Sequence, residues 1–210
     1  MIFKDRHEAG QRLAEKLKEY KNKKDIIVLG IPRGGVEVAF EVAKRLKATL
    51  SIVVTKKIGH PFEAEFAIGS VSPGNYIVDE KYGDEAGKDY IKNTVREMNK
   101  EIKRRYRAYT KGKMPEIKNK IIIVVDDGLA TGFTMLAAIK YARSKNPKKL
   151  IVAIPVAAQD SFEKVKEASD EIICLHIPSF FGAVGSFYRE FMQLEDREVK
   201  SYLEESKKFC

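Results

Sequence analysis

The stretch IIIVVDDGLATGFTM, residues 121–135, joins five consecutive β-branched residues to two adjacent acids and a turn that contains glycine. Such an unbroken apolar run is typical of a strand that is buried on both faces of a sheet. Asp126 and Asp127 repel each other and neither suits a strand, so they should mark its carboxyl end. In open α/β sheets, ligands bind outside the carboxyl ends of the strands. We therefore expect a ligand site here.

The residues after the acids have the composition of a phosphate-binding turn. Gly128 and Gly132 let the backbone approach an anion closely. Thr131 and Thr134 add hydroxyl donors, and the helix that follows offers unpaired N–H groups. The G-K-[ST] core of a Walker A loop is missing. Because carboxylates repel phosphate, the acids should instead accept hydrogen bonds from hydroxyls or lie near a metal. Ribose 5-phosphate, which has a phosphate and a diol, satisfies the whole stretch.

The rest of the chain alternates between short apolar runs and amphipathic segments, which predicts an α/β fold with a doubly wound, mostly parallel sheet and helices on both faces. The expected strands are 25–31, 50–55, 121–126, 150–157 and 171–177. The expected helices are 5–20, 36–46, 134–145, 161–169 and 195–208.

Two segments depart from this alternation. Pro73-Gly74 lies between two short apolar runs and predicts a hairpin, and residues 84–109 predict one long basic helix. The apolar side of that helix needs a partner, either another subunit or the edge of the sheet. We expect a core over 1–175, with hairpin and helix inserted at about 66–112, and a C-terminal hood with a closing helix over 176–210.

Composition narrows the class of protein. The chain has 210 residues, 44% hydrophobic and 33% charged, with a net charge of +9. That charge suits nucleic acid, a membrane surface or an anionic small substrate, or equally a solvated surface rich in Lys and Glu. Two cysteines and three histidines argue against a disulfide framework and a His/Cys metal centre. The sequence shows no secretory leader and no run of about 18 apolar residues, so we expect the protein to be located in a reducing cytoplasm.

The segment VVDDGLATGFTM closely resembles the signature of the type I phosphoribosyltransferases, which bind 5-phosphoribosyl 1-pyrophosphate (PRPP). The resemblance implies that Asp126 and Asp127 are the catalytic acids and hold the ribose 2′- and 3′-hydroxyls. It also implies that the turn holds the 5′-phosphate through Gly128, Leu129, Ala130, Thr131, Gly132, Phe133 and Thr134. Ala130 stands where the hypoxanthine-guanine branch has an acid that moves a proton on the purine, which argues against that branch. Adenine phosphoribosyltransferases also have Ala there, but their other segments find no match in this chain.

Two further segments fit the same family. In GIPRGGVEVA, residues 30–39, the resemblance assigns Arg33, Gly34 and Gly35 to the pyrophosphate and makes the Pro32–Arg33 bond a candidate for the cis form. Family members place a flexible loop near residues 55–69, so Lys56 and Lys57 could reach the pyrophosphate or form an ordinary solvated pair. Glu65 could accept a proton or be a surface carboxylate.

The stretch HIPSFFGAVGSFYREF, residues 176–191, corresponds to the hood that holds the nucleobase in this family. Phe181 and Tyr188 are the candidate base-contacting residues, because aromatic faces stack on flat rings. The alternative is that these aromatic side chains form the core of the hood.

The resemblance implies an enzyme that moves the phosphoribosyl group of PRPP to a nitrogen of a nucleobase-like acceptor and releases pyrophosphate. Mg²⁺ is the expected cofactor, held mainly by PRPP with no protein ligand assigned. A homo-oligomer is expected, whereas nucleic acid and membrane are not expected as partners. The alternative is a regulator that senses PRPP and binds nucleic acid through its basic surface, and a third possibility is chemistry on an acceptor that is not a base.

Overall fold

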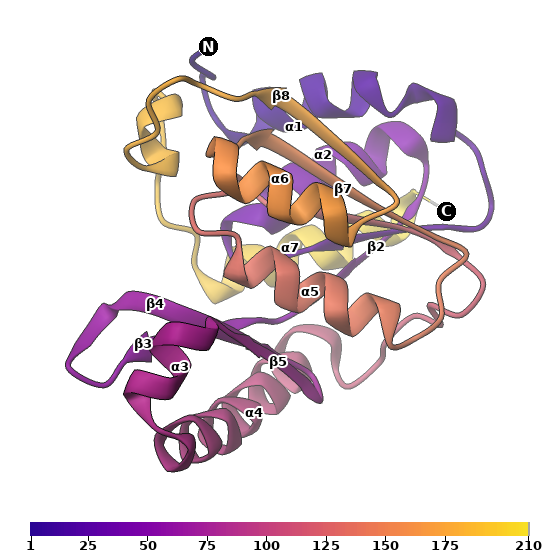
Figure 1. The fold of residues 1–210 in the computed structure, drawn as a ribbon. Coiled ribbons are helices and arrows are strands. Elements are labelled where there is room, and N and C mark those ends of the chain that lie inside the picture. The colour runs from indigo at the N-terminus through magenta and orange to yellow at the C-terminus, as the bar shows by residue number, and fades with distance from the viewer. Residues whose placement is uncertain (210) are drawn as a thin grey trace.

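A five-stranded parallel sheet runs through the centre of the computed structural model, which describes residues 1–209 (Figure 1). The order of the strands is β2-β1-β6-β7-β8. Their bounds are Thr49–Ile52 for β2, Ile26–Gly30 for β1, Ile121–Val125 for β6, Lys149–Val156 for β7 and Glu171–His176 for β8. The predicted α/β fold with a parallel sheet is confirmed.

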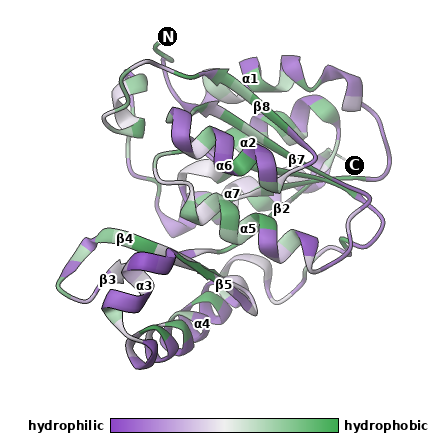
Figure 2. Ribbon diagram, viewed as in Figure 1, coloured by the Kyte–Doolittle hydropathy of each residue, from purple (hydrophilic) through white to green (hydrophobic). Residues whose placement is uncertain are grey.

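Helices cover both faces of this sheet, which explains why its central strands are apolar throughout. In β1, Ile26 and Val28 pack toward one group of helices, and Ile27 and Leu29 pack toward the other. Figure 2 shows the resulting hydrophobic layer between helices whose outer faces are hydrophilic. The first group is α1 (Arg6–Lys16), α2 (Gly34–Leu46) and α7 (Asp196–Glu205), and the second is α5 (Phe133–Arg143) and α6 (Gln159–Ala168).

Residues 56–110 form a second lobe, here called the inserted lobe, which lies beside the main sheet (Figure 1). It has an antiparallel sheet in the order β3-β4-β5 and two helices. The bounds are Lys56–His60 for β3, Glu63–Ser72 for β4, Asn75–Val78 for β5, Glu80–Ala86 for α3 and Lys88–Thr110 for α4. The hairpin predicted at Pro73-Gly74 is the β4–β5 turn. The residues near 55–69, where the resemblance places a flexible loop, form the paired hairpin of β3 and β4.

The single helix expected over 84–109 is divided into α3 and α4 at Gly87, whose φ of 83° a helix cannot accommodate. The apolar side of α4 packs on β3, β4 and the edge of the main sheet at β2, so the sheet edge is its partner within this chain. Tyr106 makes that connection specific, because its hydroxyl donates to the Ile52 carbonyl at 3.1 Å and accepts from the Val54 N–H at 3.2 Å. Within residues 1–209, no helix is both long and apolar enough to span a membrane.

After β8 the chain crosses the carboxyl ends of the strands as residues 177–195, here called the strap. The strap includes the short helix η2 (Val184–Phe187) and is tied to the N-terminus, with Phe3 donating to the Phe187 carbonyl at 2.8 Å and accepting from Arg189 at 2.9 Å. The closing helix α7 then packs against α2 and α4. Two single turns complete the described chain, η1 (Lys18–Tyr20) and η3 (Ser206–Lys208).

Candidate active site

A cavity of about 520 Å³ lies at the carboxyl ends of β1, β2 and β6 and brings together most of the predicted site. From the acid pair and the turn it is lined by Asp126, Asp127, Gly128, Ala130, Thr131, Gly132 and Thr134. From the other two predicted segments it is lined by Arg33, Gly34, Lys56 and Lys57. These segments are far apart in sequence and meet because parallel strands end at the same edge of a sheet. A cavity of about 580 Å³ lies between the ends of α4 and α7, remote from the acids.

The acid pair follows directly after β6, and both carboxyls are half-buried. The Asp127 N–H donates to Asp126 Oδ1 at 2.9 Å, which fixes the first acid relative to the second. Burial raises the pKa of Asp126, and repulsion by Asp127 raises it further. Burial also raises the pKa of Asp127, while the positive charges of Arg6 and Lys57 oppose that rise. The pair therefore lies in surroundings that disfavour two negative charges unless cations or a ligand compensate them.

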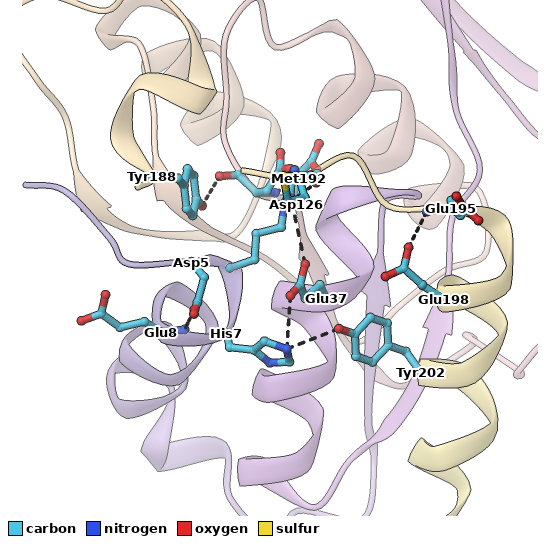
Figure 3. Close-up of polar contacts among 12 residues, drawn as sticks. Asp5, His7, Glu8, Glu37, Asp126, Tyr188, Met192, Glu195, Glu198 and Tyr202 are labelled. Atoms are coloured by element: carbon cyan, nitrogen blue, oxygen red, sulfur yellow. Dashed lines mark hydrogen bonds and ion pairs between the residues drawn. The ribbon is translucent and has the colours of Figure 1, made fainter. Parts of the chain in front are cut away.

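Arg6 is a member of the site that the sequence analysis missed. Its Nε donates to Asp127 Oδ2 at 2.8 Å, and its side chain is almost completely buried. Glu37, in the first turn of α2, lies 3.8 Å from the same guanidinium and continues the network to His7 at 3.2 Å (Figure 3). Arg6 stands among other charged residues of the N-terminal segment, so no local pattern distinguishes it.

The two glycines of the Arg33-Gly34-Gly35 turn let helix α2 start directly against the acids. A side chain on Gly34 would overlap the Asp127 carboxylate, and one on Gly35 would lie 2.7 Å from Asp126 Oδ1. Gly35 is buried and does not line the cavity, whereas Arg33 does, one third exposed. The peptide bond between Pro32 and Arg33 is cis, as predicted.

The turn between β6 and α5 has the geometry of an anion site. Gly132 caps α5 with a φ of 82° and has no side chain to bond the first N–H groups of the helix, so these groups remain available to a ligand. Leu129 is buried and bonds through its backbone to Val156 and Ala158, which anchors the turn on β7. Phe133 lines the neighbouring cavity described below.

The β3–β4 hairpin forms the opposite wall of the cavity. Lys56 and Lys57 start β3 and line the cavity, as does Glu65 from β4. Thr55, just before the lysines, has a buried hydroxyl with no hydrogen-bond partner. Such an atom in a ligand cavity suits a bound oxyanion or a bridging water.

A second cavity of about 450 Å³ adjoins the first and shares Ala67, Ala130 and Thr131 with it. It contains the predicted base-contacting Phe181. Three further aromatic side chains line it from the inserted lobe and α5, namely Phe66, Tyr82 and Phe133.

The other predicted base-contacting residue, Tyr188, has a different position. Its ring is buried between Phe3 and Phe191, and its hydroxyl donates to the Asp127 carbonyl at 2.6 Å (Figure 3). It lines neither cavity and supports the backbone of the acid pair from behind.

Among residues 1–209, no group of three His, Cys, Asp or Glu side chains is arranged to hold a metal ion. The available donors are two carboxylates beside a cavity with cationic walls. That donor set fits Mg²⁺, which usually keeps several waters and is bound through substrate phosphates and one or two carboxylates.

Comparisons with known proteins agree with this geometry. The profile of the phosphoribosyl transferase domain matches residues 3–191. Two Mycobacterium tuberculosis proteins, from strains H37Rv and CDC 1551, are provisionally named phosphoribosyl transferases. Each is 37% identical to this chain in an alignment of 211 positions, which covers 97% of this chain and 46% of the relative. The chain thus spans about half the length of these curated relatives.

The crystal structure of TT1426 from Thermus thermophilus has a TM-score of 0.82 and 35% identity, covering 98% of this chain and 99% of that one. A uracil phosphoribosyltransferase of Acinetobacter baylyi is 33% identical over 66 residues, 31% of this chain and 31% of that protein.

Proposed function

The chain belongs to the phosphoribosyl transferase domain family, and from that premise we propose that it transfers the 5-phosphoribosyl group of PRPP to a nitrogen of a nucleobase-like acceptor and releases pyrophosphate. One observation carries the proposal. A single cavity has an acid pair on one side, an open helix N-terminus on the second and three cationic side chains on the third. A phosphorylated ribose with a pyrophosphate has complementary groups in the same arrangement.

In this proposal each wall has its own task. Asp126 and Asp127 accept hydrogen bonds from the ribose hydroxyls, and residues 128–134 bind the 5′-phosphate through backbone N–H groups. Arg33, Lys56 and Lys57 neutralise the pyrophosphate as it leaves, which favours a transition state with positive charge on the ribose. Mg²⁺, held mainly through the pyrophosphate oxygens, would add charge stabilisation at the leaving group.

We propose the second cavity as the acceptor site. It opens onto the first at Ala130 and has aromatic walls, which suit a flat ring. Phe181 from the strap remains the proposed base contact. For Tyr188, the structure suggests support of the acid pair rather than stacking, because its ring is buried and its hydroxyl is engaged.

The test is release of pyrophosphate from PRPP with Mg²⁺ and a panel of purine and pyrimidine bases. We expect release with at least one base, and a KM for that base that rises in Phe181→Ala while the KM for PRPP stays unchanged. Asp127→Asn should lower turnover by weakening capture of the ribose. Unchanged turnover in Asp127→Asn would remove that residue from the mechanism. PRPP binding without release for any base, together with salt-sensitive binding of RNA or DNA, would favour a PRPP sensor.

A further inference from the structure

Arg6 is held on every side by groups that belong to the site or to the strap. The Nε atom donates to Asp127 Oδ2 at 2.8 Å and the Nη1 atom donates to the Met192 carbonyl at 2.8 Å. The Phe191 ring lies against the flat face of the guanidinium, 3.8 Å from Cζ to the ring centroid. The side chain is only 7% exposed, and these contacts place its Nε atom against one oxygen of Asp127.

Arg6 supplies the buried positive charge among a group of carboxylates. Three carboxylates meet at this point, Asp126 and Asp127 after β6 and Glu37 from α2. The facing positive groups are Arg6 from α1 and Lys57 from β3, and only Arg6 is buried. His7 faces Glu37 at 3.2 Å, and the Tyr188 hydroxyl from the strap is engaged with the Asp127 carbonyl. Removing Arg6 would leave the acids with one exposed lysine.

We propose that Arg6 is a positioning residue for ribose binding, because its charge and its Nε–H group hold one oxygen of Asp127 and leave the other oxygen to accept hydrogen bonds from the ribose hydroxyls. This inference rests on the proposed function of the acid pair. An ionised carboxylate only accepts hydrogen bonds, whereas a protonated one competes as a donor. A planar guanidinium suits the task better than an ammonium, since it contacts Asp127 and the Met192 carbonyl through separate N–H groups.

The experiment measures PRPP binding by calorimetry, with Mg²⁺ present, in the wild type, Arg6→Gln, Arg6→Lys and Arg12→Gln. Arg12 lies on the same helix and pairs with Glu8 at the surface, so Arg12→Gln is the matched control. Arg6→Gln should weaken PRPP binding about 10- to 100-fold at neutral pH, the loss expected for a hydrogen bond to a charged group at a buried site. Arg6→Lys should lose less PRPP affinity than Arg6→Gln, and Arg12→Gln should bind PRPP as tightly as the wild type does.

The pH profile separates positioning from a general structural role. Without Arg6 the pKa of Asp127 should rise, so Arg6→Gln should recover affinity as the pH is raised and the carboxyl ionises. PRPP affinity equal to that of the wild type would overturn the proposal. So would a loss that is the same at every pH and is not reduced in Arg6→Lys. If Arg6→Gln does not fold, Arg6→Lys is compared with the wild type by the same criteria.

A second measurement is independent of PRPP. The titration of the Asp127 carboxyl is followed by carbon-13 NMR in the wild type and Arg6→Gln. A higher midpoint in Arg6→Gln supports the proposal, and an equal midpoint overturns it. If the wild type does not bind PRPP, the proposed function fails while this titration still decides the role of Arg6.

Discussion

Gly35 lies so close to Asp126 that a side-chain carbon on the glycine would come within 2.7 Å of the Asp126 Oδ1 atom. The same carbon would lie 2.8 Å from the Asp126 Cα and 2.9 Å from the Val125 carbonyl oxygen. Two of these three neighbours are backbone atoms that cannot move aside. The first turn of α2 and the end of β6 are therefore packed as one unit, and the position of the acids depends on a glycine that does not itself line the cavity.

The first prediction tests that packing. Gly35→Ala should lower the free energy of unfolding by about 1–3 kcal/mol, the usual cost of overpacking a tight interface. It should also weaken PRPP binding, because the acids must shift. Urea unfolding and calorimetry measure the two effects. Gly182→Ala is the control, since its nearest neighbour would be 3.7 Å away. Wild-type values for both quantities in Gly35→Ala would contradict the tight contact.

The second prediction concerns pH. Burial and Asp127 raise the pKa of Asp126 in the folded protein. Stability from such a group is fully present below its unfolded pKa of about 4 and is lost as the pH rises through the folded pKa. Asp126→Asn should therefore be more stable than the wild type at pH 7, with a gain that shrinks toward pH 4. Denaturant unfolding at several pH values provides the measurement.

Asp25→Asn is the control for that experiment, because its stability at neutral pH should change in the opposite direction. A hydrogen bond from Lys120 lowers the pKa of Asp25, so its replacement should cause a small loss of stability near neutral pH. If the free energy of unfolding varies with pH in the same way for Asp126→Asn and the wild type, the ionised Asp126 carboxylate is not disfavoured by its surroundings.

The third prediction concerns Lys57, the second residue of β3, which lines the cavity and is exposed. Lys57→Ala should weaken binding of inorganic pyrophosphate by about fivefold at low salt, since an exposed charge contact contributes at most about 1 kcal/mol. The difference should diminish as ionic strength rises. Lys103→Ala, on the exposed side of α4, should bind pyrophosphate as the wild type does. Equal effects of the two variants would mean that net charge, rather than position, governs binding.

The fourth prediction concerns the attachment of the inserted lobe. Tyr106→Phe leaves the Val54 N–H and the Ile52 carbonyl without their shared partner in a buried place. The expected loss is about 1–3 kcal/mol in the free energy of unfolding. Tyr76 is 47% exposed, so Tyr76→Phe should have no measurable effect on the free energy of unfolding. A value for Tyr106→Phe equal to that of Tyr76→Phe would show that packing alone holds the lobe.

Much of the fold could be predicted because its signals are local. Each strand of the main sheet is an apolar run, and β1, β6 and β7 are each followed by a turn and a helix with its own periodicity. The division of the basic helix at Gly87 was missed, because a single glycine within a helical pattern does not reveal a left-handed φ. The β3 strand was missed because Lys56-Lys57 at its start has no strand pattern, and its pairing with β4 stabilises it.

In the candidate site, the acid pair, the glycine-containing turn and the Arg33 turn can be recognised from the sequence, since each motif is continuous along the chain. The residues that surround these motifs are known only from the folded chain. Arg6 is 121 residues from Asp127 and Tyr188 is 61 residues from it, and no sequence pattern around either residue predicts its contact with Asp127. Such contacts arise when the helices, the strap and the sheet pack together. The separation of two residues along the sequence does not predict whether packing will bring them into contact. One short segment thus contains the acid pair, while the contacts around the pair come from residues near both ends of the chain.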